Sequence, residues 1–262
     1  MIDDFENVGG SMAVPPPVPQ TETGDIIVHQ EPRITANKLA EYVIAEPARQ
    51  MVIIKDCKFA KKAVILPYKK TRTAVKRAFT RQNLDINGLV ASAKEIEREN
   101  EQQGLSDWQR SDNTNSANAI MKVVSIVSEL SWKDARVLPA QLGGMIFAGV
   151  KVSVYPEIIF SFEHRNVSKI GAVILNTAKA DDKSLARNNG GACVGNYLSS
   201  MLFQMLLSSA SRLGPPLNSK CYAVDIFREK VYTAPASYRK LNKNLEAACK
   251  VIAAVWPTIE FD

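Results

Sequence analysis

Residues 156–179 read PEIIFSFEHRNVSKIGAVILNTAK, and this stretch decides the fold. It holds two largely apolar runs, Ile158–Phe162 and Ile170–Leu175, with a polar segment between them at Glu163–Ser168. Short runs rich in β-branched and aromatic residues on either side of a polar turn are typical of paired antiparallel strands. The stretch therefore predicts a β-hairpin that places Glu157 opposite the region of Leu175–Thr177.

Helix and strand patterns alternate after this hairpin. A strong apolar helix is predicted at about 192–210, strands at 221–227 and 231–232, and a last helix at about 237–256, which ends before Pro257. The region from about residue 145 therefore reads β-β-α-β-β-α, which predicts an α/β (α+β) fold with a mixed sheet that these two helices cover. Another β-rich segment, 145–154, precedes the hairpin.

The chain before residue 140 has helical patterns. Thr35 is expected to cap a first helix, and a basic helix is expected at Thr71–Arg81. Asn113 or Asn115 is expected to cap a helix whose buried stripe includes Ile120. The sequence therefore predicts three parts, namely an acidic, Pro-rich disordered tail (1–32), a basic helical region (33–140) and the α/β region (141–262).

Charge is unevenly distributed along the 262 residues. The chain has 33 Lys and Arg against 27 Asp and Glu, and six of the acids lie in the first 32 residues, which contain no Lys or Arg. The remaining residues therefore carry a formal net charge of +12. Such a surface attracts polyanions, and nucleic acid is the expected partner. The tail is a candidate ligand for a protein partner.

Other features narrow the class of protein. The four cysteines lie far apart and form no zinc-binding pattern, which favours reduced thiols. No apolar run has the length of a membrane span, and the N-terminus lacks the features of a secretory signal. We expect a cytoplasmic protein without a membrane partner.

The segment from Lys55 to Arg81 is the most basic part of the chain. Only Asp56 opposes its positive charges, and Phe59, Tyr68 and Phe79 are interleaved. Basic side chains contact phosphates, and planar aromatic side chains can stack on bases. The alternative is a solvated face with the phenylalanines in the core. The residues expected to contact nucleic acid are Lys61, Lys62, Lys69, Lys70, Arg72, Lys76 and Arg77.

The predicted hairpin carries a second candidate site. Pro156-Glu157 comes at the end of a predicted strand, Val152–Tyr155, and a later strand ends in Asn176-Thr177-Ala178-Lys179. A carboxylate beside a polar residue and a lysine can hold Mg²⁺ and steady an attacking water. The alternative is that Pro156 ends a strand and Glu157 faces solvent. Asp225, within an apolar strand, needs a Lys or Arg partner or must point outward.

This pattern resembles the PD-(D/E)XK nuclease superfamily, in particular its RecB-like branch. Those domains place an acid after proline on one strand and (D/E)-x-K on the next strand of a hairpin, followed by a helix that carries Gln and Tyr and by further strands. Here Pro156-Glu157 matches the first element, and the predicted helix carries Tyr197 and Gln204. The resemblance implies catalytic roles for Glu157, Asn176 and Lys179, with Glu157 as the ligand of a Mg²⁺ cofactor.

The sequence departs from the family pattern at two positions. Asn176 stands where the second acid belongs, and Ala178 stands where the lysine belongs, with Lys179 one residue later. Asn is a weaker Mg²⁺ ligand than a carboxylate, and a lysine displaced by one residue faces the other side of a regular strand. Asp181 or Asp182 could supply the missing acid.

Three hypotheses follow. The first is a nucleic-acid-binding accessory protein with a degenerate nuclease-like domain, acting in replication, repair, a mobile element or antiviral defence. The second is an active Mg²⁺-dependent nuclease that uses Glu157, one of Asp181 or Asp182, and Lys179. The third is a protein–protein adaptor that uses the basic face and the Pro-rich tail.

Overall fold

A computed structural model describes the main chain of most of the protein. The described residues are 21–23, 26–61, 68–79, 84–130, 132, 134–140, 142–178 and 193–261. The fold is mixed α/β, with a helical N-terminal part followed by a sheet-rich region, as the sequence predicted.

A five-stranded mixed sheet forms the centre of the molecule. Its order is β11-β10-β9-β8-β5, in which β9 and β10 are parallel and every other pair is antiparallel. The hairpin of β8 and β9 is confirmed. The order β-β-α-β-β-α holds only from Ile158 onwards, because two more strands lie between 145 and 153 and a short helix at Ala210–Leu213 precedes β10. The strands are β5 (Arg136–Leu138), β8 (Ile158–His164), β9 (Val167–Asn176), β10 (Pro216–Asp225) and β11 (Lys230–Thr233).

The β8–β9 turn fixes the register of the hairpin. His164 pairs with Val167, so the loop consists of Arg165 and Asn166, whose φ angles are 53° and 59°. Positive φ at both positions matches the twist of the strands in a tight hairpin. This register carries Ile158 opposite Val173, so Glu157 lies level with Ile174, one residue short of the predicted region Leu175–Thr177 but still near the end of β9.

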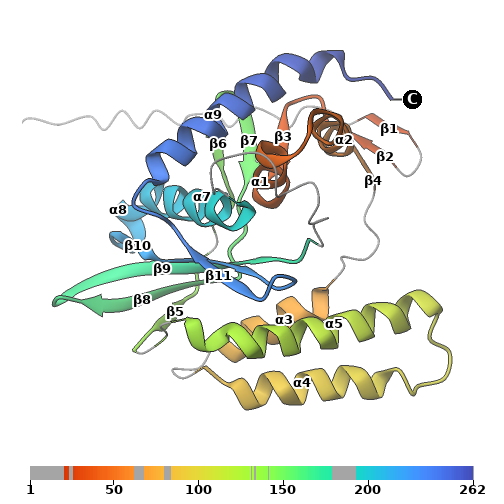
Figure 1. The fold of residues 1–262 in the computed structure, drawn as a ribbon, viewed down its shortest axis with the longest axis vertical. Coiled ribbons are helices and arrows are strands. Elements are labelled where there is room, and N and C mark those ends of the chain that lie inside the picture. The colour runs from red at the N-terminus through yellow and green to blue at the C-terminus, as the bar shows by residue number, and fades with distance from the viewer. Residues whose placement is uncertain are drawn as a thin grey trace, which may run out of the picture.

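Helices cover one face of the sheet (Figure 1). Ile159, Ala172 and Ile174 alternate along β8 and β9 and pack in the same apolar cluster as Leu39 and Leu198. The helices that contribute to this cluster are α1 (Ala36–Ile44), α2 (Pro47–Lys58), α7 (Val194–Ser208) and α9 (Tyr238–Val255).

The opposite face is also covered, so the sheet is the middle of three layers (Figure 1). Phe160, Val173 and Leu175 point to this side, and Trp132 packs between Phe160 and Phe79, with ring centroids 4.6 Å from each and with the ring planes steeply inclined. The helices on this side are α3 (Lys69–Phe79), α4 (Ile86–Glu99) and α5 (Asp107–Ile126), of which α4 packs on α3 and α5. Burial on both faces explains why β9 is apolar from Ile170 to Leu175.

Two small sheets flank these layers. The β-rich segment at 145–154 forms the hairpin of β6 (Met145–Phe147) and β7 (Val150–Ser153), which joins β3 (Arg33–Thr35) and not the central sheet. The other sheet contains β1 (Thr21–Thr23), β2 (Ile26–Val28) and β4 (Phe59–Lys61). The short helices are η1 (Val127–Glu129), α8 (Ala210–Leu213) and η2 (Trp256–Thr258).

The predicted disordered tail needs one correction. Residues 1–20 lie outside the described part of the chain, but Ile26–Val28 pairs with Phe59–Lys61. The indole Nε1 of Trp256 also donates to the main-chain oxygen of His29 at 3.1 Å. The predicted disorder therefore does not extend to these residues, because strand pairing and a contact from the C-terminal end of the chain hold them.

Two helix caps can be compared with the sequence. Thr35 caps α1, as expected, by accepting from the Lys38 N–H at 3.4 Å. The expected cap at Asn113 or Asn115 is wrong, because α5 begins at Asp107. Ser106 and Gln109 form a capping box there, in which each side chain accepts from the other residue's main chain.

Candidate functional site

The candidate site lies where β9 and β10 end. These parallel neighbours finish at the same edge of the sheet, with Asn176 paired with Asp225. Glu157 reaches this edge from the start of β8, and its N–H donates to the Val173 oxygen at 2.9 Å. Ligand sites in α/β proteins commonly lie at the carboxyl ends of parallel strands. We call Glu157, Asn176 and Asp225, together with their partners Arg72 and Arg228, the carboxyl-edge cluster.

Glu157 is the first member of the cluster. Its side chain is buried, with 8% of the residue exposed, so the alternative that it faces solvent does not hold. Oε2 accepts from the Leu175 N–H at 2.8 Å, and Oε1 forms an ion pair with the guanidinium of Arg72. Arg72 also lies 3.5 Å from the Thr177 hydroxyl. Burial lowers the pKa of the Arg72 guanidinium.

Asn176 and Asp225 form the second half of the carboxyl-edge cluster, and each is 1% exposed. Asn176 Nδ2 donates to Asp225 Oδ2 at 3.1 Å, while its Oδ1 accepts from Asn37 Nδ2 and the Ala178 N–H, both at 3.3 Å. Arg228 donates to both Asp225 oxygens, from its guanidinium at 2.9 Å and from its main-chain N–H at 3.1 Å. Asp225 therefore has the arginine partner that its place in an apolar strand required.

The cluster is compensated in charge. It contains two carboxylates and two guanidiniums, and one arginine pairs with each acid. All four carboxylate oxygens and the Asn176 Oδ1 already accept a hydrogen bond. A divalent cation would have to displace these donors and lie beside a guanidinium, which is unfavourable.

These residues therefore do not fit a Mg²⁺ ion. Within the part of the chain that the structure describes, no group of three His, Cys, Asp or Glu side chains could hold a metal. Of the three expected site residues, the structure brings Glu157 and Asn176 to one edge. Lys179, Asp181 and Asp182 lie outside the described residues.

Tyr197 and Gln204, the two residues of α7 that match the resembled helix, both bond to another helix. The Asn244 amide donates to the Tyr197 hydroxyl at 3.0 Å, and the Asn242 amide donates to Gln204 Oε1 at 3.0 Å. Both partners belong to α9. Tyr197 is fully buried. These side chains therefore join α7 to α9 on one face of the sheet.

The basic residues of α3 fall into two groups. Lys69, Lys76 and Arg77 are exposed, as expected for contacts with a polyanion. Lys70 and Arg72 are turned to internal partners, since Lys70 bonds to Glu99 and to Asn113. The sequence predicts that these five basic residues form one exposed face of the helix, and this prediction is wrong for Lys70 and Arg72, which are half-buried.

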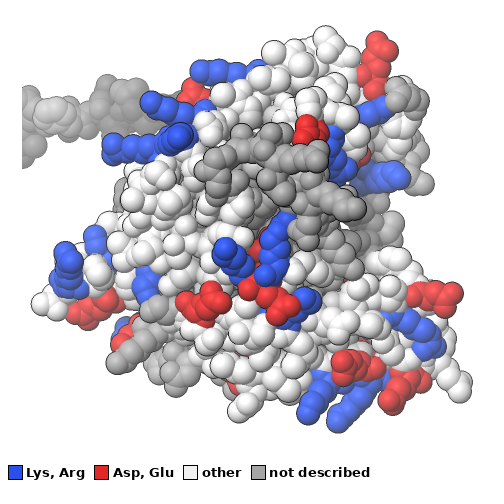
Figure 2. Space-filling model, viewed as in Figure 1, with Lys and Arg blue, Asp and Glu red and all other residues white. Residues whose placement is uncertain are grey.

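The rest of the basic segment is also mixed. Lys61 is exposed at the end of β4, and Lys62 lies outside the described residues. Phe79 is in the core, as the alternative interpretation held, and Phe59 packs against Phe261 with centroids 5.1 Å apart. Figure 2 shows basic and acidic side chains interspersed over α4 and α5, without one continuous basic patch on that side.

Sequence reasoning missed the basic half of the carboxyl-edge cluster. Arg72 was assigned to the surface because its helix is rich in exposed charge, and nothing in the local pattern links it to Glu157. Asp225 was the one available signal, because a carboxylate in an apolar strand requires a partner.

Comparisons with models of known protein families and with curated proteins found no match. Among the described residues, no helix has both the length and the apolar character needed to cross a lipid bilayer.

Proposed function

We propose that the protein is a nucleic-acid-binding accessory protein whose nuclease-like domain has lost its metal site. The observation that carries the proposal is the carboxyl-edge cluster. The hairpin of β8 and β9, followed by α7 and β10, brings Glu157 and Asn176 together at the place where the resembled nucleases bind metal. Arg72 and Arg228 neutralise the two acids there.

The distribution of charge supports the binding role. The chain after the acidic first 32 residues carries a formal net charge of +12. Lys69, Lys76 and Arg77 are exposed on α3, the same helix that supplies Arg72 to the cluster. Lysine and arginine side chains neutralise phosphates and release counterions, so the binding should weaken steeply with added salt.

The binding role can be tested by fluorescence anisotropy with labelled oligonucleotides over a salt series. The triple variant Lys69→Gln, Lys76→Gln, Arg77→Gln should weaken binding and flatten its salt dependence, by a slope of about 0.9 for each duplex DNA phosphate that the variant no longer neutralises. A control with the same change of charge is Arg239→Gln, Lys240→Gln, Lys243→Gln on α9, whose side chains are also exposed. The proposal fails if the wild type binds no nucleic acid, or if the α3 variant binds as tightly as wild type at every salt concentration.

The loss of the metal site can be tested by restoring the family pattern with Asn176→Asp and Ala178→Lys. An acid at position 176 would lie beside Asp225, so the pair should attract a divalent cation more strongly than the wild type does. Calorimetric titration with Mg²⁺ and Mn²⁺ measures this, with a cleavage assay alongside. Metal-dependent cleavage by the wild type that Glu157→Ala abolishes would instead establish an active nuclease.

A further inference from the structure

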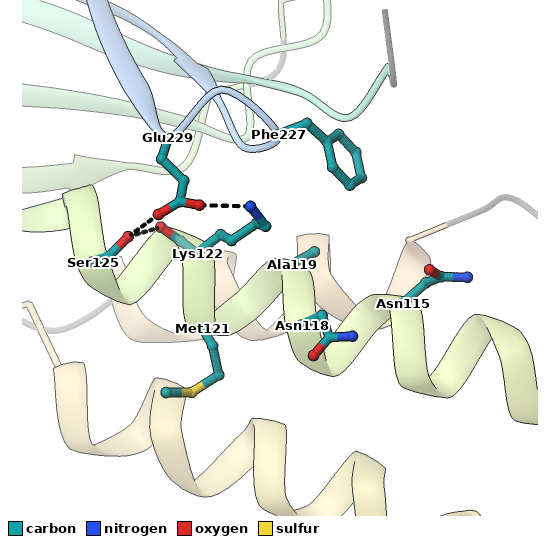
Figure 3. A pocket seen from close by; sticks show the side chains of 8 residues that line it. All are labelled: Asn115, Asn118, Ala119, Met121, Lys122, Ser125, Phe227 and Glu229. Atoms are coloured by element: carbon teal, nitrogen blue, oxygen red, sulfur yellow. Dashed lines mark hydrogen bonds and ion pairs between the residues drawn. The ribbon is translucent and has the colours of Figure 1, made fainter.

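An open groove lies between α5 and the turn that joins β10 to β11 (Figure 3). Its volume is about 530 Å³, within the range of small-molecule sites. The groove is separate from the carboxyl-edge cluster but adjoins it, because its wall residue Phe227 precedes Arg228 in the chain. The lining residues are Asn115, Asn118, Ala119, Met121, Lys122, Ser125, Phe227 and Glu229.

The charged groups of the groove bond to each other. Lys122 Nζ lies 2.5 Å from Glu229 Oε1, and the Ser125 hydroxyl donates to Glu229 Oε2 at 3.1 Å. Hydrogen bonds from Lys122 and Ser125 lower the pKa of the Glu229 carboxyl, which stays ionised at neutral pH. The groove therefore has no net charge to offer a phosphate.

The other lining groups suit a flat, neutral, polar molecule. Asn115 and Asn118 supply amides, and the Asn118 side chain is exposed on α5. Figure 3 shows the Phe227 ring extending from the turn on the same side of α5 as the Asn115 amide. An amide can pair with the edge of a base, and an aromatic ring can stack on its face.

The aromatic wall continues towards the basic helix. The ring of Phe227 contacts that of Tyr68 edge-on, with centroids 5.6 Å apart and planes at 69°. Tyr68 immediately precedes the exposed Lys69 at the start of α3, and Arg228 follows Phe227. Aromatic side chains beside cations are the arrangement that proteins use to bind single-stranded nucleic acid.

We propose that this groove binds an unpaired nucleobase of a single-stranded segment. Phe227 stacks on the base, Asn118 bonds to its edge, and Lys69 contacts the neighbouring phosphate. The inference rests on the proposed nucleic-acid-binding function and specifies the class of ligand. A base in a duplex is stacked and paired, so it cannot enter the groove, and the protein should prefer single strands.

The test compares two groove variants with a control on the same helix. Phe227→Leu keeps an apolar side chain but removes the aromatic face, and Asn118→Ala removes the amide. Trp108→Leu is the matched control, because Trp108 is an exposed aromatic residue of α5 (47% exposed) that does not line the groove. Anisotropy with labelled single-stranded and duplex oligonucleotides of equal length measures the affinities. Quenching of 2-aminopurine in the single strand reports stacking.

Phe227→Leu should weaken single-strand binding roughly five- to one-hundred-fold, the range for removal of one base–aromatic stack. It should also reduce the quenching and leave duplex binding unchanged. Asn118→Ala should alter the preference among bases, Trp108→Leu should bind as wild type, and Phe227→Trp should retain binding. The inference is overturned, while the proposed function stands, if the wild type binds nucleic acid and both groove variants bind single strands as tightly as the wild type does. If the wild type binds neither single strands nor duplexes, the proposed function itself fails.

Discussion

Replacing Arg72 with methionine would leave the buried Glu157 carboxylate without its cation. Removing one partner of a buried ion pair costs about 3–5 kcal/mol. The cost should be smaller here, because 37% of the Arg72 side chain is exposed and Glu157 keeps its hydrogen bond from Leu175. Loss of one hydrogen bond to a charged group costs about 1.5–3 kcal/mol, and we expect Arg72→Met to lower the free energy of unfolding by that amount.

A double-mutant cycle isolates the pair. Glu157→Gln removes the charge but keeps an oxygen that can accept from the Leu175 N–H. In Arg72→Met with Glu157→Gln no buried charge is left uncompensated, so part of the stability lost in Arg72→Met should return. Urea denaturation of the wild type and the three variants, followed by circular dichroism, gives the four free energies of unfolding. We expect a coupling energy of about 1–2 kcal/mol between the two sites.

The matched control for this cycle is Lys76→Met, which removes an exposed cation from the same helix and should change stability by less than about 0.5 kcal/mol. If Arg72→Met is no more destabilising than Lys76→Met, or if the two changes of the cycle are additive within about 0.5 kcal/mol, Arg72 does not stabilise Glu157 and the argument for a charge-compensated edge is refuted.

Three further predictions concern the scaffold. In Gly171→Ala the new methyl group would overlap the Lys220 carbonyl oxygen and the Phe160 ring. Such overpacking costs about 1–3 kcal/mol or more, so calorimetry should show a lower melting temperature. Ser106→Ala removes the cap of α5 and should cost about 1 kcal/mol in denaturation, whereas Ser106→Asp should cost little. Burial and Arg33 lower the pKa of His29 below 6.5, so the unfolded chain takes up a proton more readily as the pH falls. The contribution of neutral His29 to the free energy of unfolding should be fully present above pH 6.5 and should decline below it. The variant His29→Gln should therefore lose less stability as the pH falls.

The central hairpin could be predicted because its signals are local. Apolar runs and a polar turn define β8 and β9, and their similar lengths bring Glu157 to the end of β9. The helices α7 and α9 also follow from local spacing of apolar residues, and the order of elements after residue 156 was correct.

The second helical layer could not be predicted in the same way. The apolar stripes of α3, α4 and α5 show that each helix buries one face, but they do not say against what. The structure packs α3 and α5 on the sheet face that carries Phe160 and Leu175, and it packs α4 on α3 and α5. Periodicity gives the buried side of a helix, whereas its partner depends on contacts between distant parts of the chain.

The ion pair of Arg72 and Glu157 illustrates the same limit at the level of the site. The two residues are 85 positions apart in the sequence, and Arg72 lies among lysines and arginines that do face solvent. Composition assigned all the basic side chains of this helix to the surface. Only the packing of α3 against the sheet brings this one arginine over the edge where Glu157 lies, and that packing has no local signature.

The proposed nucleic-acid binding and the proposed base-binding groove both depend on which charged side chains lack a partner of opposite charge. At the end of the sheet, each acid of the carboxyl-edge cluster has an arginine partner, and in the groove Lys122 has Glu229. Neither place offers net positive charge to a phosphate. Under the proposed function, the nucleic-acid backbone would therefore be attracted by cations such as Lys69 and Lys76, which are exposed on α3. A backbone held along α3 passes Tyr68 at the start of the helix, and Phe227 lies beside it. Under the further proposal, an unpaired base turned away from that backbone reaches the uncharged groove, whereas a paired base cannot. The separation of the cations on α3 from the aromatic groove therefore accounts for the proposed preference for single strands.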